Sequence, residues 1–437
     1  MKSPRSFSTP DARRRSTRRG FTTPAVAIAL LVVMAGLALI LDRLWLDAAD
    51  LELTTAAEIA ALAAAGELAS DDLLKSSPNP DHRLDMARNS ASWIASQNYV
   101  AGDPVQLDSN PEGDIRLGKL VLDEFENKIR FEETTDNPMT AVVSSLRSRR
   151  SSNPVGLFTA GVTGQPFGDV ATRVEASVDN RVVGLRPLKD APIPALPIAI
   201  WLNDPTGRRN DTWRTQIEAR KGKDEFGYDS LGHHVTEGAD GIPEMTLRSQ
   251  APGGGINLNT VVVDVGAGLS DTVLAQQFAR GFSTEDLVAS GGELSIFDAT
   301  PQTLRASGEL RHGDREALES IIGEPRICLL YSTAVPAVSG DIIQATCVRM
   351  VAVRVLSVRD LTDGSCELVV QPCIVKTRTA ILDAPQPYST ENVVPVSPYL
   401  TNPTHPATGA TTTQMSGSTP VTTGSGHPFI YKLHLTH

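Results

Sequence analysis

The chain has 437 residues, with 51 acidic and 40 basic side chains and a net charge of −11. Seven basic residues and one acid give the first 20 residues a charge of +6, which leaves −17 for the remainder. Such an acidic remainder argues against nucleic acid as a partner, because a phosphate backbone requires a basic face. The length is sufficient for two or three domains.

The N-terminal region begins with a basic leader at residues 1–20, and the stretch from Gly20 to Leu41 carries no charge. About 20 residues at a rise of about 1.5 Å each cover the roughly 30 Å of bilayer hydrocarbon, so we predict a transmembrane helix at residues 21–42. Basic residues on its N-terminal side favour a cytoplasmic N-terminus, with the bulk of the chain extracytoplasmic. The sequence thus predicts a single-pass protein of the inner (cytoplasmic) membrane, with Trp45 as an interfacial aromatic.

Two other interpretations of this start stay open. A cleaved signal peptide usually has a shorter apolar region of about 7–15 residues and a small-x-small cleavage site, which does not directly follow the run here. A prepilin-like leader would make Gly20 and Phe21 a processing site, with Phe21 as the mature first residue. Type IV pilins carry glutamate at the fifth position after such a cut, where this chain has Ala25.

An alanine-dense segment follows the apolar run, with eight alanines in the fourteen residues 56–69. Alanine strongly favours helix, so we predict a stalk helix at residues 43–75 that continues the transmembrane helix. Small side chains at helical spacing let another helix approach closely. The residues predicted for helix packing are Ala57, Ala60, Ala61, Ala64 and Ala65. A stable stalk without a partner is the alternative.

The rest of the chain predicts an α+β fold with mixed α/β ectodomains and a strand-rich C-terminal half. Residues 81–190 combine an amphipathic helix at 82–98 with short alternating strands. Residues 191–381 contain a buried strand at 259–265, a helix at 271–282, a helix at 316–323 and late strands around the turn signal Asp363-Gly364. Residues 382–437 are rich in proline, threonine and serine and are predicted to be a disordered tail.

The four cysteines all lie in the late segment, and an extracytoplasmic compartment favours disulfides. Segments 326–334 and 342–350 are predicted to fold back on each other as two strands, which favours a bridge between Cys328 and Cys347. Cys366 and Cys373 lie about 23 Å apart on an extended run. There is no Cys-x-x-Cys, so zinc is not expected.

Two segments are candidate chemical sites. Residues 264–271 supply Gly266-x-Gly268 after a strand, but Asp271 replaces the third glycine of the dinucleotide fingerprint. Capping of the next helix by Ser270 or Asp271 explains this sequence without a ligand.

The second segment is a loop rich in histidine and carboxylate residues. Transition-metal or calcium ligation is conceivable there, although the spacing matches no defined metal loop. The residues concerned are Asp229, His233, His234, Glu237, Asp240 and Glu244. We predict no catalytic residue, no metal, no cofactor and no small-molecule substrate, and therefore a protein that is not an enzyme.

The leader, the single span and the alanine block resemble the N-terminal region of TadG-like (TadE/TadG) proteins of the bacterial tight-adherence, or Flp pilus, machinery. Segments 96–107, 113–120, 135–143 and 156–164 extend this similarity over residues 18–180. Later phrases at 240–247, 282–294 and 321–332 look like a long TadG-like subtype without a von Willebrand domain. Glu58 stands where such proteins usually carry an acidic residue.

This resemblance implies a non-catalytic component of pilus assembly in the cell envelope, facing the periplasm. Its expected partners are pilin-like membrane proteins and tight-adherence assembly components, which it contacts through its transmembrane and stalk helix. The rival interpretations are an anchored envelope hydrolase or metal-binding protein that uses the loop at 233–244, and a cell-surface binding module.

Overall fold

The computed structural model describes residues 22–123, 128–151, 153–230, 232–248, 259–297, 300–308, 310, 314–336, 342–361, 366–383 and 426–436. Within it the chain divides into two compact units. Unit 1 takes the chain up to Leu53 together with Tyr99–Asp103 and Leu146–Thr172, and unit 2 takes Thr54–Asn98, Pro104–Ser145 and Arg173–His437. The predicted class, an N-terminal apolar helix followed by a strand-rich mixed body, is confirmed.

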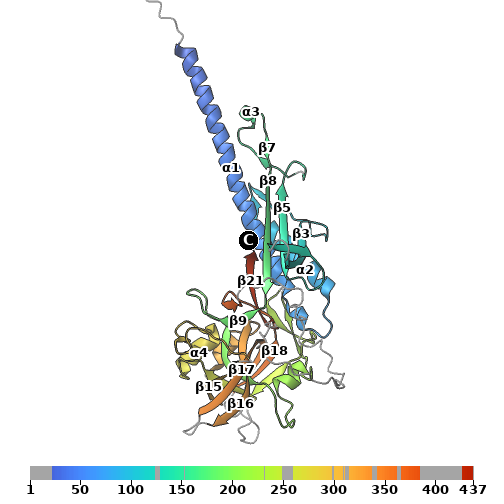
Figure 1. Cartoon of the computed structure of the whole chain (residues 1–437), viewed down its shortest axis with the longest axis vertical. Helices are drawn as coiled ribbons and strands as arrows, with labels where there is room; N and C mark the ends of the chain where they lie inside the picture. Colours follow the sequence, from blue (N-terminus) through green and yellow to red (C-terminus); the bar gives the residue numbers. More distant parts are fainter. Residues whose placement is uncertain are drawn as a thin grey trace, which may run out of the picture. The chain divides into compact units, whose positions relative to one another are not determined.

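Helix α1 (Thr22–Leu68) is a single 47-residue helix (Figure 1). By length and composition it is the one helix of the described residues that is long and apolar enough to cross a membrane. At about 1.5 Å per residue it is about 70 Å long, more than twice the thickness of bilayer hydrocarbon. Only part of the helix is therefore needed for a span, and the rest is available to the body.

Unit 1 adds only short elements to its part of α1. They lie in the segments 99–103 and 146–172, which carry the residues that contact the helix. These elements are β1 (Tyr99–Val100), β2 (Asp103–Pro104), β6 (Val155–Gly156), α3 (Ala160–Thr163) and β7 (Phe167–Gly168). Strand β6 pairs antiparallel with β7, so that α3 lies at the tip of a hairpin.

Unit 2 contains most of a six-stranded sheet of order β19-β21-β8-β5-β3-β4. Its strands are β3 (Ile115–Asp123), β4 (Lys128–Glu133), β5 (Thr140–Arg147), β8 (Val170–Asp179), β19 (Val375–Lys376) and β21 (Ile430–Thr436). Strand β21 is antiparallel to β8, with Lys432 opposite Asp179 (Figure 1). Helix α2 (Pro80–Ser96) begins at Asn79, whose side chain accepts a hydrogen bond from the amide of His82, and it buries Leu84 and Ala87.

A second sheet has seven strands and closes on itself. The strands are β10 (Ala195–Trp201), β13 (Met245–Arg248), β14 (Thr260–Asp264), β15 (Gln302–Ser307), β16 (Pro325–Pro336), β17 (Ile342–Asp360) and β18 (Cys366–Pro372). Strand β17 is long enough to pair with β15, β16 and β18 in turn, and β16 also pairs in parallel with β10. The ring β17-β15-β14-β10-β16 is therefore closed, and β18 and β13 extend from β17 as a branch that ends at β13.

The remaining elements of unit 2 surround these two sheets. They are η1 (Asp71–Leu74), β9 (Val182–Leu185), η2 (Arg214–Glu218), β11 (Phe226–Asp229), β12 (His234–Glu237), α4 (Asp271–Arg280), η3 (Val288–Ser290), α5 (Arg315–Glu319) and β20 (Ala380–Leu382). Strand β9 pairs with β20, so residues from both predicted ectodomains, 81–190 and 191–381, share one small sheet. Both predicted ranges lie mainly within unit 2.

Two predicted boundaries differ from the observed elements. The helical stalk expected to residue 75 ends at Leu68 and continues as the 3-10 turn η1. The tail expected at 382–437 does not extend to its end, because residues 426–436 belong to unit 2 and include β21. Apolar residues explain this difference, since Phe429, Ile430 and Tyr431 are buried. Residues 384–425 and the turn signal Asp363-Gly364 lie outside the described residues.

The alanine face of α1 is buried inside unit 2. All five alanines predicted for packing with a partner helix are at most 1% exposed: Ala57, Ala60, Ala61, Ala64 and Ala65. Farther along the helix, Gly66 accepts a hydrogen bond from Lys376 Nζ at 2.9 Å through its carbonyl oxygen. The chain's own body therefore covers the surface that the sequence assigned to a partner, which corrects that expectation.

Asp71 of η1 fixes the end of α1 to the rest of unit 2. One carboxylate oxygen accepts from Arg354 of β17 at 2.7 Å, and the other accepts from the amide of Ile374 at 2.6 Å. The guanidinium of Arg354 is also hydrogen-bonded to the carbonyl of Gly323 and lies 3.5 Å from the ring centroid of Tyr228. The side chain of Arg354 is only 6% exposed, so its charge depends on Asp71 for compensation.

We expect Ala61→Leu to destabilise unit 2 by about 1–3 kcal/mol, because a larger side chain overpacks a completely buried position. Ala63→Leu on the same helix is the matched control, since Ala63 is only half-buried and should change stability by about 0.5 kcal/mol or less. Chemical denaturation of the full chain in detergent measures both. Equal stability of the two variants would contradict the packing described here.

We expect Arg354→Met to cost about 3–5 kcal/mol, because it leaves Asp71 without its buried cation. The double variant Asp71→Leu/Arg354→Met should recover part of that loss, since no uncompensated charge remains. Asp190→Asn is the control: it removes the exposed pair with Arg378, whose side chains are 67% and 71% exposed, and should cost about 1 kcal/mol or less. Denaturation midpoints that rank these variants otherwise would contradict the role of Asp71.

Candidate functional site

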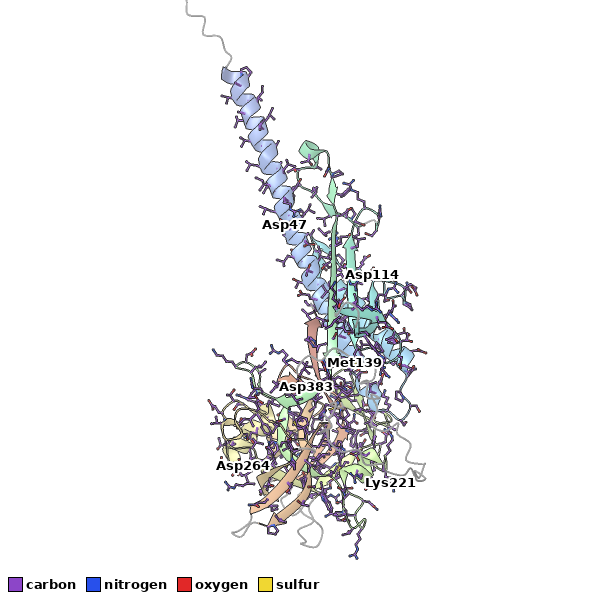
Figure 2. The ribbon with its side chains drawn as sticks, in the orientation of Figure 1. Asp47, Asp114, Met139, Lys221, Asp264 and Asp383 are labelled. Carbon is purple, nitrogen blue, oxygen red and sulfur yellow. The ribbon has the colours of Figure 1, made fainter. Side chains whose placement is uncertain are left out.

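The candidate site is the N-terminal part of α1, whose apolar side chains are exposed. From Val26 to Leu41 the large apolar residues that α1 exposes have between 52% and 69% of their surface accessible. Figure 2 shows side chains projecting outward along the part of α1 that precedes Asp47. A soluble protein rarely leaves so large an apolar surface in water, so this surface matches hydrocarbon or another apolar helix.

A hairpin tip of unit 1 is hydrogen-bonded to α1 at the end of this apolar surface. Asp42 is 5% exposed, and its carboxylate accepts hydrogen bonds from the amides of Phe158 and Thr159 at 3.0 and 3.2 Å. The hydroxyl of Thr159 donates to the same carboxylate and lies 3.5 Å from the carbonyl of Ala38. Asp42 therefore satisfies amides just before α3, as an acidic N-cap does.

Trp45 lies one helical turn beyond Asp42 and contacts the same hairpin. Its indole nitrogen donates to the carbonyl of Gly156 at 3.1 Å, and its ring lies 4.8 Å from that of Phe158. Next to it, Leu46 packs so closely on Gly168 that a β-carbon there would lie 2.5 Å from Leu46 Cδ2. A larger residue at this position would therefore have to displace the Leu46 side chain from the hairpin.

The histidine- and carboxylate-rich loop uses its acids to bind backbone amides. Glu244 is 3% exposed, and its carboxylate accepts from the amides of Glu225 and Phe226. Asp240 accepts from the amide of Ile242 at 2.9 Å. Burial raises the pKa of both carboxyl groups. These interactions hold the loop that follows β12 in place.

The histidines of this loop are at the other end of the β11–β12 hairpin. His233 has a positive φ of 52° and its Nδ1 lies 3.3 Å from the hydroxyl of Tyr228. His234 Nδ1 lies 3.9 Å from Asp229 Oδ2, and Glu237 is exposed at the end of β12. Across the described ranges, no three histidine, cysteine or carboxylate side chains are grouped as a metal ion requires.

The glycine-containing loop at 264–271 is organised by its first acid. Asp264, labelled in Figure 2, accepts from the amides of Gly266 and Gly268 at 2.9 and 2.8 Å. Both glycines have positive φ, 134° and 93°, which the tight turn requires. Ser270 occupies the N-cap position of α4 without a capping side-chain bond, and Asp271 is the first helical residue. The predicted strand at 259–265 and helix at 271–282 are confirmed as β14 and α4. The turn between them is stabilised by the hydrogen bonds that the Asp264 carboxylate accepts.

The predicted Cys328–Cys347 bridge is not formed, and all four cysteines are free and buried. The two strands do pair antiparallel, as expected, but Cys328 lies opposite Val351 and Cys347 opposite Tyr331. Four residues of register separate the two sulfurs by about 13 Å along the strands, beyond the reach of a disulfide. Burial raises the pKa of Cys347 to about 12, so this thiol is protonated at neutral pH.

His427 is a buried polar residue that the sequence did not single out. Its Nε2 lies 3.2 Å from the carbonyl of Met350, and its Nδ1 accepts from the amides of Phe429 and Ile430 at 3.2 and 3.0 Å. This pattern requires a neutral ring that is protonated on Nε2. Burial lowers the pKa of His427 to about 4. The residue thereby fixes the start of β21.

The comparisons give this chain no relative: no family model, no curated protein and no solved structure matches it. The predicted processing site at Gly20 and Phe21 lies outside the described residues. Asp42 and Thr159 were not among the predicted site residues. The one sequence signal for Asp42 is that it is the first charged residue after the uncharged run.

We expect the full chain to lose stability as the pH falls from 6.5 to about 4. In that window the unfolded chain protonates His427 while the folded chain keeps it neutral, so the loss attributable to this residue approaches about 3 kcal/mol. Above pH 6.5 the ring is neutral in both states and contributes no pH dependence. Urea titrations at several pH values measure this dependence.

The variant His427→Gln should be less stable at pH 7 but should show a shallower decline toward pH 4. His82→Gln is the control, because His82 is exposed and its variant should keep the original pH dependence. A His427→Gln profile parallel to that of the unchanged chain would contradict this assignment.

Proposed function

We propose that this chain is a non-catalytic, single-pass membrane component of tight-adherence (Flp-type) pilus assembly. In this role the N-terminal part of α1 packs in the inner membrane with pilin-like partner helices, and unit 2 and the rest of unit 1 face the periplasm. The proposal joins the TadG-like sequence resemblance to one structural observation. That observation is the contrast along α1 between exposed apolar residues before Leu41 and buried alanines after Ala56.

Because of this contrast, we assign the partner-binding surface to the apolar N-terminal part of α1 and not to the alanine-rich stalk. The alanines at 57–65 are covered by the chain itself, so they have no free surface for another helix. Within the apolar part, Ala25, Ala29 and Gly36 recur at helical spacing, and the space beside Gly36 is open. Small residues in this arrangement let two helices approach closely in lipid, where packing rather than the hydrophobic effect drives association.

A photo-reactive amino acid at Val33, which is 57% exposed, tests this contact in cells that contain the tight-adherence components. We expect it to capture a pilin-like membrane protein. The substitution Ala29→Leu should greatly reduce capture, because the larger side chain separates the helices. Ala27→Leu is the matched control, since Ala27 is also exposed and lies on another face of α1.

Capture of lipid alone at Val33, or equal capture with both leucine variants, would contradict the proposed role of α1. Intact-mass analysis of the membrane-purified chain then separates two forms of that role. A mature start at Phe21 indicates prepilin-like processing and incorporation into a filament. An intact leader indicates a fixed component of the inner membrane.

A further inference from the structure

The hairpin tip that α1 holds through Asp42 has an unusual composition. Residues 156–168 contain no charged or histidine side chain, whereas Arg149, Arg150 and Asp169 lie just outside this stretch. Phe158 is 70% exposed and Phe167 is 43% exposed. A surface loop of thirteen residues normally carries polar and charged groups, because it meets water on most sides. This tip therefore has the composition of a surface that meets an apolar phase.

The position of the tip on α1 is fixed by several independent contacts. Thr159 lies against Ala38 and Asp42, and Gly156 accepts a hydrogen bond from Trp45. The helix rises about 27 Å between Pro24 and Asp42, which is close to the thickness of bilayer hydrocarbon. If the span begins near Pro24, these contacts place α3 at the depth where hydrocarbon meets the headgroups.

The side chains at this depth are of the kinds that concentrate at the membrane–water interface. Trp45 and Phe158 are in ring contact at 4.8 Å, and aromatic rings concentrate at the headgroup level of membranes. Arg149 lies with its guanidinium 5.9 Å from the ring of Phe167 and donates to the carbonyl of Phe167 at 2.9 Å. An arginine that extends along an aromatic surface can keep its charge in water while the ring is buried.

We propose that the tip formed by residues 156–168 inserts into the interfacial layer of the same bilayer that α1 spans. This inference rests on the membrane anchoring contained in the proposed function and not on the pilus partners. The occupant of the exposed surface around Phe158 is lipid, because the tip is bound directly to the end of the apolar part of α1 through contacts with Ala38, Asp42 and Trp45. Unit 1 would then contact the membrane twice and be held against it.

Depth-dependent quenching in the full chain tests this proposal. A single cysteine is introduced at Phe158, labelled with an environment-sensitive fluorophore, and measured in phosphatidylcholine–phosphatidylglycerol vesicles that contain lipids spin-labelled either near the headgroup or deep in the acyl chain. The four native cysteines are buried, and the unchanged chain gives the labelling background. Leu31→Cys, in the apolar part of α1, reports the anchor, and Val288→Cys, which is 72% exposed in unit 2, is the matched exposed control.

We expect a blue shift at positions 31 and 158, with quenching by the acyl-chain label at position 31 and by the headgroup label at position 158. Neither effect is expected at position 288. A second probe at Gly161, where a β-carbon meets open space, leaves Phe158 in place and should be quenched as well. Adding Phe158→Ser to the Gly161→Cys variant should reduce that quenching, with circular dichroism confirming the fold.

Quenching at position 31 but not at 158 or 161 would overturn this inference and leave the anchor intact. Absence of quenching at position 31 would overturn the membrane anchor, and with it both the proposed function and this inference. Equal quenching at position 288 would also overturn it, since the contact would then not be specific to the tip.

Discussion

The buried pair between Asp71 and Arg354 is the interaction on which unit 2 depends. It joins the turn that ends α1 to β17, the strand that closes the barrel ring. The second oxygen of Asp71 binds the amide of Ile374, which lies between β18 and β19, so one carboxylate connects the helix to both sheets of the unit. Removing two ions from water is costly, and a hydrophobic contact of the same shape can be equally stable. What the pair adds is direction, because the two oxygens of Asp71 bind two different partners, Arg354 and the amide of Ile374.

A single helix meets two different environments along its length, and its composition changes accordingly. Before Leu41 the side chains are large, apolar and exposed, as a lipid-facing surface requires. After Ala56 one face of the helix carries small, completely buried alanines, which allows the body to approach the helix axis closely. Between these parts, Asp42 and Trp45 have polar groups that bind the backbone of the hairpin tip. The chemistry of each part thus follows from what surrounds it.

Local patterns in the sequence predicted most elements but not their partners. The uncharged run, the amphipathic helix at α2 and the buried strand at β14 were predicted because periodicity and composition are local properties. The alanine face was correctly recognised as a packing surface, but composition cannot distinguish a partner helix from the chain's own sheet. The strands around Cys328 and Cys347 were also predicted, whereas their register, which places Cys328 opposite Val351, is not encoded in a local pattern. Asp42, Asp71 and His427 act through residues distant in sequence, and single-sequence reasoning has no means of finding such pairs.

The position of β21 inside its sheet constrains how this protein can fold. Lys432 lies opposite Asp179, and β21 is bounded by β19 on its other side, so the strand is internal and not an added edge. Until residues 430–436 have been synthesised, β8 lacks its neighbour on the side away from β5. Its backbone then exposes an unpaired edge, the kind of surface that promotes aggregation. Pairing β21 with β8 also closes the long stretch of chain between them into a loop, and contacts between residues so distant in sequence slow folding. Unit 2 can therefore reach its final structure only after synthesis has passed β21, and a nascent chain needs protection of β8 until then.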